Sequence, residues 1–279
     1  MRQVFNLIDT CFSHHRAESN TDSTVAGRDS DSILWDRSLS DLSRPSFYSH
    51  EKILLPDKKT KNNYGLIFES RAIIPHLYTA VEEFIPEFKV FYTHNSVLLK
   101  KYETCKWIPG GGIWVGGKLG LGEIALHKKS KLCSMVSSNK TMCSLHMARL
   151  SYFNRLQSYN FIDFFGANTG WVPIAKTLED YMFSIVMENF VDELYFTEKI
   201  LNCFATGTIP IYHGARDIRK LFNANGILSF DNFEDLDKII NSITPDYYLS
   251  KMDAIQENFE KSKNYKCMDD YIMTTYGVE

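Results

Sequence analysis

Short apolar runs alternate along this chain with segments whose apolar residues have helical spacing. Runs that predict strands lie at 4–9, 65–70, 88–94, 131–138, 161–166, 182–189, 208–214 and 226–230. Segments that predict helices lie at 76–84, 96–103, 141–157, 197–207 and 217–223, and from residue 233 onward. Pro75 and Asn95 support two of the helix starts, because Pro is favoured in the first helical turn and Asn at the N-cap. Strands that alternate with helices predict βαβ units, so we expect an α/β fold with mostly parallel sheets.

A glycine-rich stretch at 107–122 divides this pattern into two halves. Glycine at this density opposes both helix and strand, so we expect a loop there. We therefore expect an N-terminal domain at 1–128 and a C-terminal domain at 129–279, with the last helices able to pack back on the first domain. Residues 112–118 fit the pattern G-x-x-x-x-G-K, but Leu119 follows where Ser or Thr must bind magnesium. We do not expect a nucleoside-triphosphate loop.

The composition is that of a soluble globular protein, with 279 residues, of which 44% are hydrophobic and 23% charged. A net charge of −3 gives no basic footprint of a nucleic-acid binder. No apolar run approaches the roughly 18 residues of a membrane span, and the N-terminus lacks a signal sequence. We expect a soluble, cytoplasmic protein. The six cysteines have no C-x-x-C spacing, which argues against a zinc framework.

The acidic and histidine residues form no metal-binding pattern. The chain has no H-E-x-x-H motif. Asp29 and Asp31 form a D-S-D triplet, but no apolar run precedes it, so we interpret it as a solvated loop. We therefore expect no metal site.

The segment 181–214 carries the strongest chemical pattern. An apolar run ends in Glu188 and Asn189, and Thr197 then stands at the N-cap of a helix whose first turn contains Glu198 and Lys199. The free N–H groups of a first helical turn suit an anion such as a diphosphate, and Lys199 adds a full charge. Glu198 suits a pair of ribose hydroxyls instead. Taken alone, these residues also fit an ordinary capped helix.

The whole segment resembles the motif of the α1,3/4-fucosyltransferases, glycosyltransferase family 10. That motif runs Tyr-x-Phe, apolar residues, Glu-Asn, a variable stretch, Tyr-x-Thr-Glu-Lys, and a turn before Gly-Thr-(Ile/Val)-Pro-(Ile/Val). The matching residues are Tyr181, Phe183, Glu188, Asn189, Tyr195, Thr197, Glu198, Lys199, Gly207, Thr208, Ile209, Pro210 and Ile211.

A second match lies upstream of the first. In the family a Ser-Asn pair precedes a helix of the form Arg-x-x-aromatic-aromatic-x-x-Leu, and a strand with Asp and Gly follows. This chain has Ser138-Asn139, then a helix that starts its motif at Arg149, then the strand 162–166. The resemblance implies that Arg149 and Lys199 bind the donor diphosphate, that Glu198 holds the ribose, and that Glu188, Asn189 and Tyr195 belong to the same pocket. Arg155 competes with Arg149, but it stands at a variable position of the motif.

The N-terminal half matches less well. The family's proposed general base is a glutamate after a strand, often in Glu-Ser-Pro, and here Glu69-Ser70 is followed by Arg71. A carboxylate at the carboxyl end of a parallel strand lies where such sheets bind ligands, although it would also fit a simple ion pair with Arg71. Three other carboxylates are weaker rivals on a helix face or loop, Glu82, Glu83 and Glu87. His14, in a polar stretch after the first strand, and His94, at the end of another, are candidates for the acceptor side.

The resemblance implies a GT-B fold, in which two Rossmann-like domains enclose a cleft, and an inverting transfer of fucose from GDP-fucose to a glycan hydroxyl, with an α1,3-type linkage. It implies no required cofactor, because Arg149, Lys199 and the helix N-terminus can meet the charge of the departing diphosphate. Two alternatives stay open at this point: a transferase of the same fold that uses another nucleotide sugar, such as GDP-mannose, and a non-catalytic nucleotide-sugar-binding protein.

Overall fold

The computed structural model describes residues 2–9, 28–57, 62–118, 120–167 and 170–278. By its internal contacts the chain forms two compact units, residues 1–112 with 266–279, and residues 113–265. The domain boundary expected at residue 128 stays a prediction. Each unit is described by itself below.

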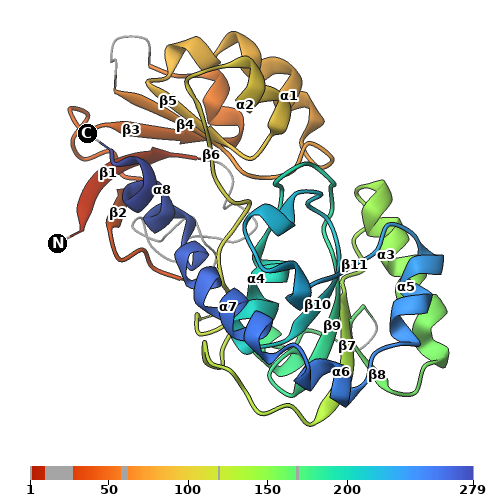
Figure 1. Cartoon of the computed structure of the whole chain (residues 1–279). Helices are drawn as coiled ribbons and strands as arrows, with labels where there is room; N and C mark the ends of the chain where they lie inside the picture. The colour runs from red at the N-terminus through yellow and green to blue at the C-terminus, as the bar shows by residue number, and fades with distance from the viewer. Residues whose placement is uncertain (1, 10–27, 58–61, 119, 168–169, 279) are drawn as a thin grey trace. The chain divides into compact units, whose positions relative to one another are not determined.

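The first unit is built on a parallel sheet. Among its described residues the sheet has six strands in the order β2-β1-β3-β4-β5-β6, and every strand pair is parallel. Figure 1 shows α1 and α2 on one face of this sheet and α8 on the other. The elements are β1 (Gln3–Ile8), β2 (Ile33–Asp36), β3 (Ser46–Ser49), β4 (Asn63–Ile67), α1 (Pro75–Ala80), β5 (Val90–Thr93), α2 (Ser96–Lys101), β6 (Cys105–Trp107) and α8 (Met268–Tyr276).

The last helix, α8, completes the first unit through buried polar contacts. The indole Nε1 of Trp35, on β2, donates to Asp269 Oδ2 at 2.9 Å, and both residues have 0% exposure. Asp270 accepts from the Ser30 hydroxyl at 2.6 Å and from the Ser32 backbone N–H at 2.8 Å. A buried indole N–H needs a partner, so residues from the two ends of the sequence are required together.

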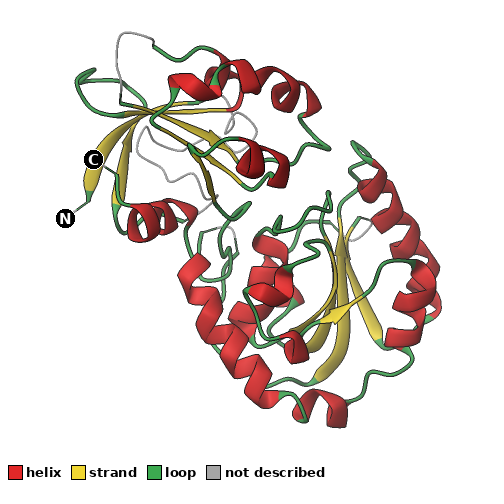
Figure 2. Ribbon diagram, turned by 45° about the horizontal axis from the view of Figure 1, so that its top comes forward, coloured by secondary structure: helices red, strands yellow, loops and turns green. Residues whose placement is uncertain are grey.

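The second unit is also built on a parallel sheet, which in the described part of the chain has five strands in the order β11-β10-β9-β7-β8. Helices cover both faces, with α3 and α5 on one side and α4 and α7 on the other (Figures 1 and 2). The elements are β7 (Lys131–Ser137), α3 (Ser144–Arg155), β8 (Ile162–Gly166), β9 (Tyr181–Met187), α4 (Glu198–Thr206), β10 (Ile209–His213), β11 (Leu228–Ser229), α5 (Phe233–Ile240), α6 (Pro245–Leu249) and α7 (Met252–Ser262).

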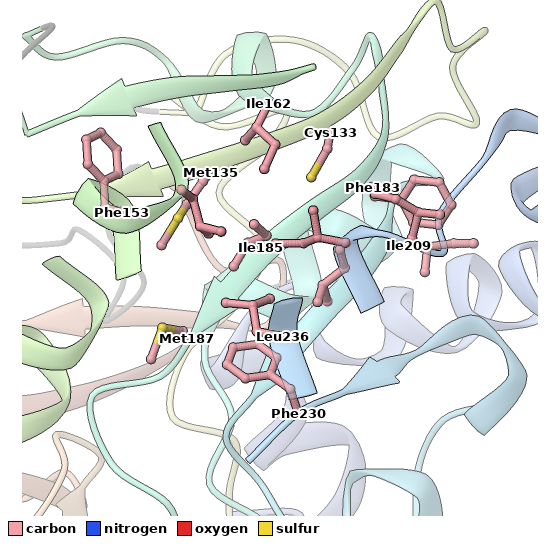
Figure 3. Packing of buried hydrophobic residues seen from close by; sticks show 14 of the residues in the cluster. Cys133, Met135, Phe153, Ile162, Phe183, Ile185, Met187, Ile209, Phe230 and Leu236 are labelled. Atoms are coloured by element: carbon pink, nitrogen blue, oxygen red, sulfur yellow. The ribbon is translucent and has the colours of Figure 1, made fainter. Parts of the chain in front are cut away.

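The core of the second unit follows from the two-residue period of its strands. Alternate side chains of a strand point to one face, so the apolar residues of neighbouring strands gather in rows. Figure 3 shows such rows, and the following residues are all at most 2% exposed: Cys133, Met135, Phe183, Ile185, Met187, Ile209 and Ile211. Phe153 of α3 and Leu236 of α5 pack against them. This packing fixes the carboxyl ends of β9 and β10.

The structure confirms most of the expected elements. The alternating α/β pattern and the parallel sheets are as expected, and the Asn95 side chain caps α2 by accepting from the Leu98 N–H at 3.0 Å. Three short strands were not expected: β2, β3 and β6. The helix expected at 217–223 is wrong, since only a 3₁₀ turn at Ile218–Lys220 forms there. The segment ends after one turn because Asn223 has an extended backbone, and its N–H donates to Asn258 Oδ1 at 2.6 Å rather than to a carbonyl of a preceding turn.

Candidate functional site

Seven residues expected to form a donor site come together in the second unit. They stand at the carboxyl end of β9, in the loop that follows it, at the start of α4, and on α3. Ligands of parallel α/β sheets bind at this edge, outside the carboxyl ends of the strands. The seven are Arg149, Glu188, Asn189, Tyr195, Thr197, Glu198 and Lys199.

Glu188 occupies the centre of the group and is fully buried, with 0% exposure. Its Oε1 accepts from the Thr197 backbone N–H at 2.9 Å, and its Oε2 accepts from the Thr197 hydroxyl at 2.7 Å. Lys199 Nζ lies 3.3 Å from Oε2. Burial raises the pKa of the Glu188 carboxyl, while Lys199 and the Thr197 hydrogen bonds oppose that rise. Glu188 thus fastens the end of β9 to the start of α4.

Lys199 is shared between two carboxylates. Its Nζ donates to the Thr197 hydroxyl at 2.9 Å and to Glu198 Oε1 at 3.1 Å, in addition to its pairing with Glu188. Burial opposes the charge of Lys199, but the carboxylates of Glu188 and Glu198 outweigh it and raise its pKa. Burial likewise opposes the charge of Glu198, but Lys199 lowers its pKa overall. The Lys199 side chain is 28% exposed, so these partners do not enclose it completely.

The N-terminus of α4 begins within this cluster. Thr197 is its N-cap, with a side chain that accepts from the Lys199 N–H, and its backbone is extended, as N-caps require. The first N–H groups of a helix carry a partial positive charge and lack partners within the helix. The first turn of α4 therefore adds to the positive charge of Lys199.

Arg149 adds a second cation from α3. It is 7% exposed, and its Nη1 donates to the Met187 carbonyl, at the end of β9, at 3.0 Å. Its Nε is buried, and the described residues offer it no hydrogen-bond partner. A buried guanidinium with spare donors is the group that proteins use to hold phosphate or carboxylate oxygens.

Asn189 and Tyr195 tie the loop between β9 and α4 to its surroundings. The Tyr195 hydroxyl donates to Asn189 Oδ1 at 2.9 Å, and Tyr195 is only 1% exposed. The Cys143 thiol, at the N-cap of α3, donates to the Asn189 carbonyl at 3.3 Å. Cys143 was not among the expected site residues, because a cysteine at a helix start gives no pattern of its own.

The sequence analysis missed two further residues that pack against Glu188: Tyr212, on β10, and Gly214, directly after β10. Burial, followed by the nearby Glu188 carboxylate, raises the pKa of the Tyr212 hydroxyl well above its usual value. That hydroxyl also accepts from the Ala215 N–H at 3.0 Å. A Cβ on Gly214 would lie 2.7 Å from Glu188 Cγ and even closer to the Tyr212 hydroxyl. Only glycine fits there, and a Gly directly after a buried strand was the signal available in the sequence.

Replacing Gly214 by alanine is expected to destabilise the protein by about 1–3 kcal/mol, the usual cost of overpacking a buried site. The added methyl group must displace Tyr212 or Glu188, both of which are held by hydrogen bonds. Urea unfolding would show this as a lower transition midpoint with an unchanged slope. A midpoint equal to that of the wild type would contradict the close packing around Glu188.

The remaining described candidates, Glu69 and His94, lie together in the first unit. Glu69 follows the end of β4 and is half-buried, and its Oε1 accepts from the Ser70 N–H at 2.8 Å. His94 follows β5, the neighbouring strand, and has 0% exposure. Its Nε2 lies 3.3 Å from the Glu69 carbonyl oxygen. His14 lies outside the described residues.

No group of three or more His, Cys, Asp or Glu residues in the described part of the chain could hold a metal ion. None of the helices there combines the length and the apolar composition needed to cross a bilayer.

Comparison with solved structures places the fold. An α1,3-fucosyltransferase with GDP-fucose aligns with a TM-score of 0.55 and 16% identity over 95% of this chain and 89% of that chain. An α1,3-fucosyltransferase with GDP aligns with a TM-score of 0.56 and 15% identity, over 99% of this chain and 92% of that chain. Anabaena HepE in complex with UDP-glucose aligns with a TM-score of 0.50 and 12% identity, over 83% of this chain and 71% of that chain. The two parallel sheets with their helices thus form the GT-B fold of glycosyltransferases.

Sequence comparison identifies the family within that class. The model of glycosyltransferase family 10 (fucosyltransferase), C-terminal part, matches residues 126–274, which is more than half of the chain. The chain belongs to this family. An α-(1,3)-fucosyltransferase FucT of Helicobacter pylori is 35% identical over 66 residues, which make up 24% of this chain and 14% of that relative.

Proposed function

We propose that this protein is a fucosyltransferase that moves fucose from GDP-fucose to a glycan hydroxyl with inversion, forming an α1,3-type linkage. The observation that carries the proposal is the cluster of Arg149, Lys199 and the α4 N-terminus around Glu188. Arg149 and Lys199 stand at positions that match the family motif, and the family model covers both residues. The H. pylori relative and two solved structures of similar fold are α1,3-fucosyltransferases.

In this proposal the diphosphate of the donor lies against Arg149, Lys199 and the first N–H groups of α4. Arg149 offers the donor that lacks a partner among the described residues, and Lys199 offers the charge of a partly exposed side chain. Preorganised positive groups stabilise the charge that develops on the leaving diphosphate and can do so without a metal ion. The positive groups are fixed in advance, because Glu188 and Met187 hold them.

The roles of the next three residues follow from the resemblance to the family motif. Glu198 is the carboxylate that accepts from the ribose hydroxyls, while Asn189 and Tyr195 shape the same pocket. Glu188 has no exposed surface, so we assign it to holding Thr197 and Lys199 in place rather than to contact with the sugar.

Glu69 is the proposed general base. Its carboxylate takes the proton of the acceptor hydroxyl as that oxygen bonds to the anomeric carbon of fucose. The bond from that carbon to the phosphate oxygen breaks at the same time, and GDP leaves with the electron pair. Glu69 has the location that such a base requires, since it follows the carboxyl end of a parallel strand and is half-buried.

The donor assignment predicts a clear preference among nucleotide sugars. Slow hydrolysis of GDP-fucose, GDP-mannose, UDP-glucose and UDP-galactose by the purified protein would be compared through kcat/KM. We expect GDP-fucose to lead by at least about tenfold, the discrimination that a few specific contacts provide. A preference for GDP-mannose or for a UDP-sugar would replace the fucose assignment, and binding without any turnover would favour a non-catalytic role.

A further inference from the structure

We propose that Tyr78 and His94 are positioning residues for Glu69, which they orient through the peptide group between Glu69 and Ser70. The inference rests on the proposed function, because it gives Glu69 the role of general base. It assigns His94 a place behind the carboxylate rather than against the acceptor, since His94 has 0% exposure.

The contacts form a chain from two buried side chains to one carboxylate. The Tyr78 hydroxyl, on α1, donates to the Glu69 carbonyl oxygen at 2.7 Å. His94 Nε2 lies 3.3 Å from the same oxygen and 3.1 Å from the Tyr78 hydroxyl. An Nε2–H tautomer of His94 therefore donates toward both oxygens while Tyr78 donates to the carbonyl. One backbone oxygen is thus held from two directions.

The carbonyl of Glu69 and the N–H of Ser70 belong to one planar peptide group. Fixing the direction of the carbonyl therefore fixes the direction of the N–H. That N–H donates to Glu69 Oε1 at 2.8 Å, so it holds the carboxylate itself. The orientation that Tyr78 and His94 impose on the peptide plane is passed directly to the proposed base.

The topology explains why these residues meet. Ile67 of β4 pairs with Thr93 of β5, so Glu69 and His94 leave neighbouring strands at the same edge of the sheet. The turn after Glu69 is itself held, because the Ser70 carbonyl accepts from the N–H groups of Ile73 and Ile74 at 3.0 and 3.1 Å. Tyr78 follows on α1 and is 3% exposed, which makes a phenylalanine the expected residue unless the hydroxyl has a use.

The test compares Tyr78→Phe with the wild type in steady-state transfer from GDP-fucose. We expect kcat to fall by about 10- to 100-fold, the loss that follows from a displaced catalytic group, with the KM for GDP-fucose unchanged. His94→Leu should likewise lower kcat and leave KM unchanged. His94→Gln should keep most of the wild-type kcat, because the glutamine amide can place an N–H near the position of Nε2. The control is Tyr48→Phe in the same unit, whose hydroxyl accepts from the backbone N–H of Asp57 at 3.2 Å.

A double-mutant cycle with Glu69→Gln separates the positioning role of Tyr78 from the role of Glu69 as general base. If Tyr78 acts through Glu69, Tyr78→Phe should have no further effect on the slow transfer left in Glu69→Gln. Equal losses in both backgrounds, or a normal kcat in Tyr78→Phe and His94→Leu, would overturn the positioning role and leave Glu69 as base intact. Full activity of Glu69→Gln alone would overturn both.

Discussion

Replacing Glu69 by glutamine is expected to lower kcat by about 10²- to 10⁴-fold, the usual contribution of a general base, and to leave the affinity for GDP-fucose unchanged. Glutamine has nearly the same shape and can still accept from the Ser70 N–H through its amide oxygen, so the fold should persist. What it lacks is the basic carboxylate. Stopped assays of fucose transfer, together with calorimetric titration of GDP, would separate turnover from binding.

The matched control for this substitution is Glu83→Gln. Glu83 is an exposed carboxylate on the same unit and was a rival for the base in the sequence analysis. We expect its turnover to equal that of the wild type. A large loss of turnover in Glu83→Gln, with a normal rate in Glu69→Gln, would assign the role of general base to Glu83.

Replacing Lys199 by alanine is expected to weaken GDP binding by about 100-fold, because a charge-assisted hydrogen bond to phosphate contributes roughly 2–3 kcal/mol. The variant should also lose about 2–3 kcal/mol of stability. Glu188 then keeps its hydrogen bonds from Thr197 but has no cation beside it. The loss lies below that of a fully buried pair, since 28% of the Lys199 side chain is exposed.

The pH dependence of this variant has a definite sign. Burial already raises the pKa of Glu188 in the presence of Lys199, and without the cation that pKa rises further. A carboxyl whose folded-state pKa is raised contributes full stability at pH below its ordinary value of 4.5, and loses that contribution as the pH rises through the folded-state value. Urea midpoints of Lys199→Ala should therefore fall more steeply than those of the wild type as the pH rises above 4.5.

Lys131→Ala is the control for Lys199→Ala. Lys131 also pairs with a carboxylate of the second unit, Asp163, at 2.8 Å, but it stands at the opposite, amino-terminal edge of the sheet. GDP binding by Lys131→Ala should match that of the wild type. Unchanged GDP affinity in Lys199→Ala would refute its role at the diphosphate.

The parts of the molecule that the sequence predicted best are those where local pattern and packing agree. The run 182–187 lies in a strand because every residue in it is apolar or small, and Thr197 caps a helix because its side chain can accept from a backbone N–H. β2 and β3 were missed because they are four residues long and carry polar residues such as Ser46 and Ser49, whose burial depends on neighbouring strands. Strands of that length are specified by their partners rather than by their own sequence.

In the candidate site, too, the sequence predicted some features and not others. The motif residues were found together, but the use that the fold makes of Glu188 was not visible in the sequence. A glutamate after a strand can face a ligand or turn into the protein. Glu188 turns inward because Thr197, Lys199 and Tyr212 surround its carboxylate. The role of Tyr78 could not be predicted either, because its hydroxyl donates to a backbone carbonyl, and every residue type has one.

The attachment of α8 to the first unit has a consequence for the order of folding during synthesis. The ribosome completes the strands of the first unit early, but the Asp269 that satisfies Trp35 emerges only after the whole second unit, residues 113–265. At roughly 5–20 residues per second, these intervening residues take on the order of ten seconds to make. Although nascent domains usually fold in the order in which they are made, here the second unit can close first. Until α8 has been synthesised, the indole N–H of Trp35 lacks its partner Asp269, and the first unit remains incomplete.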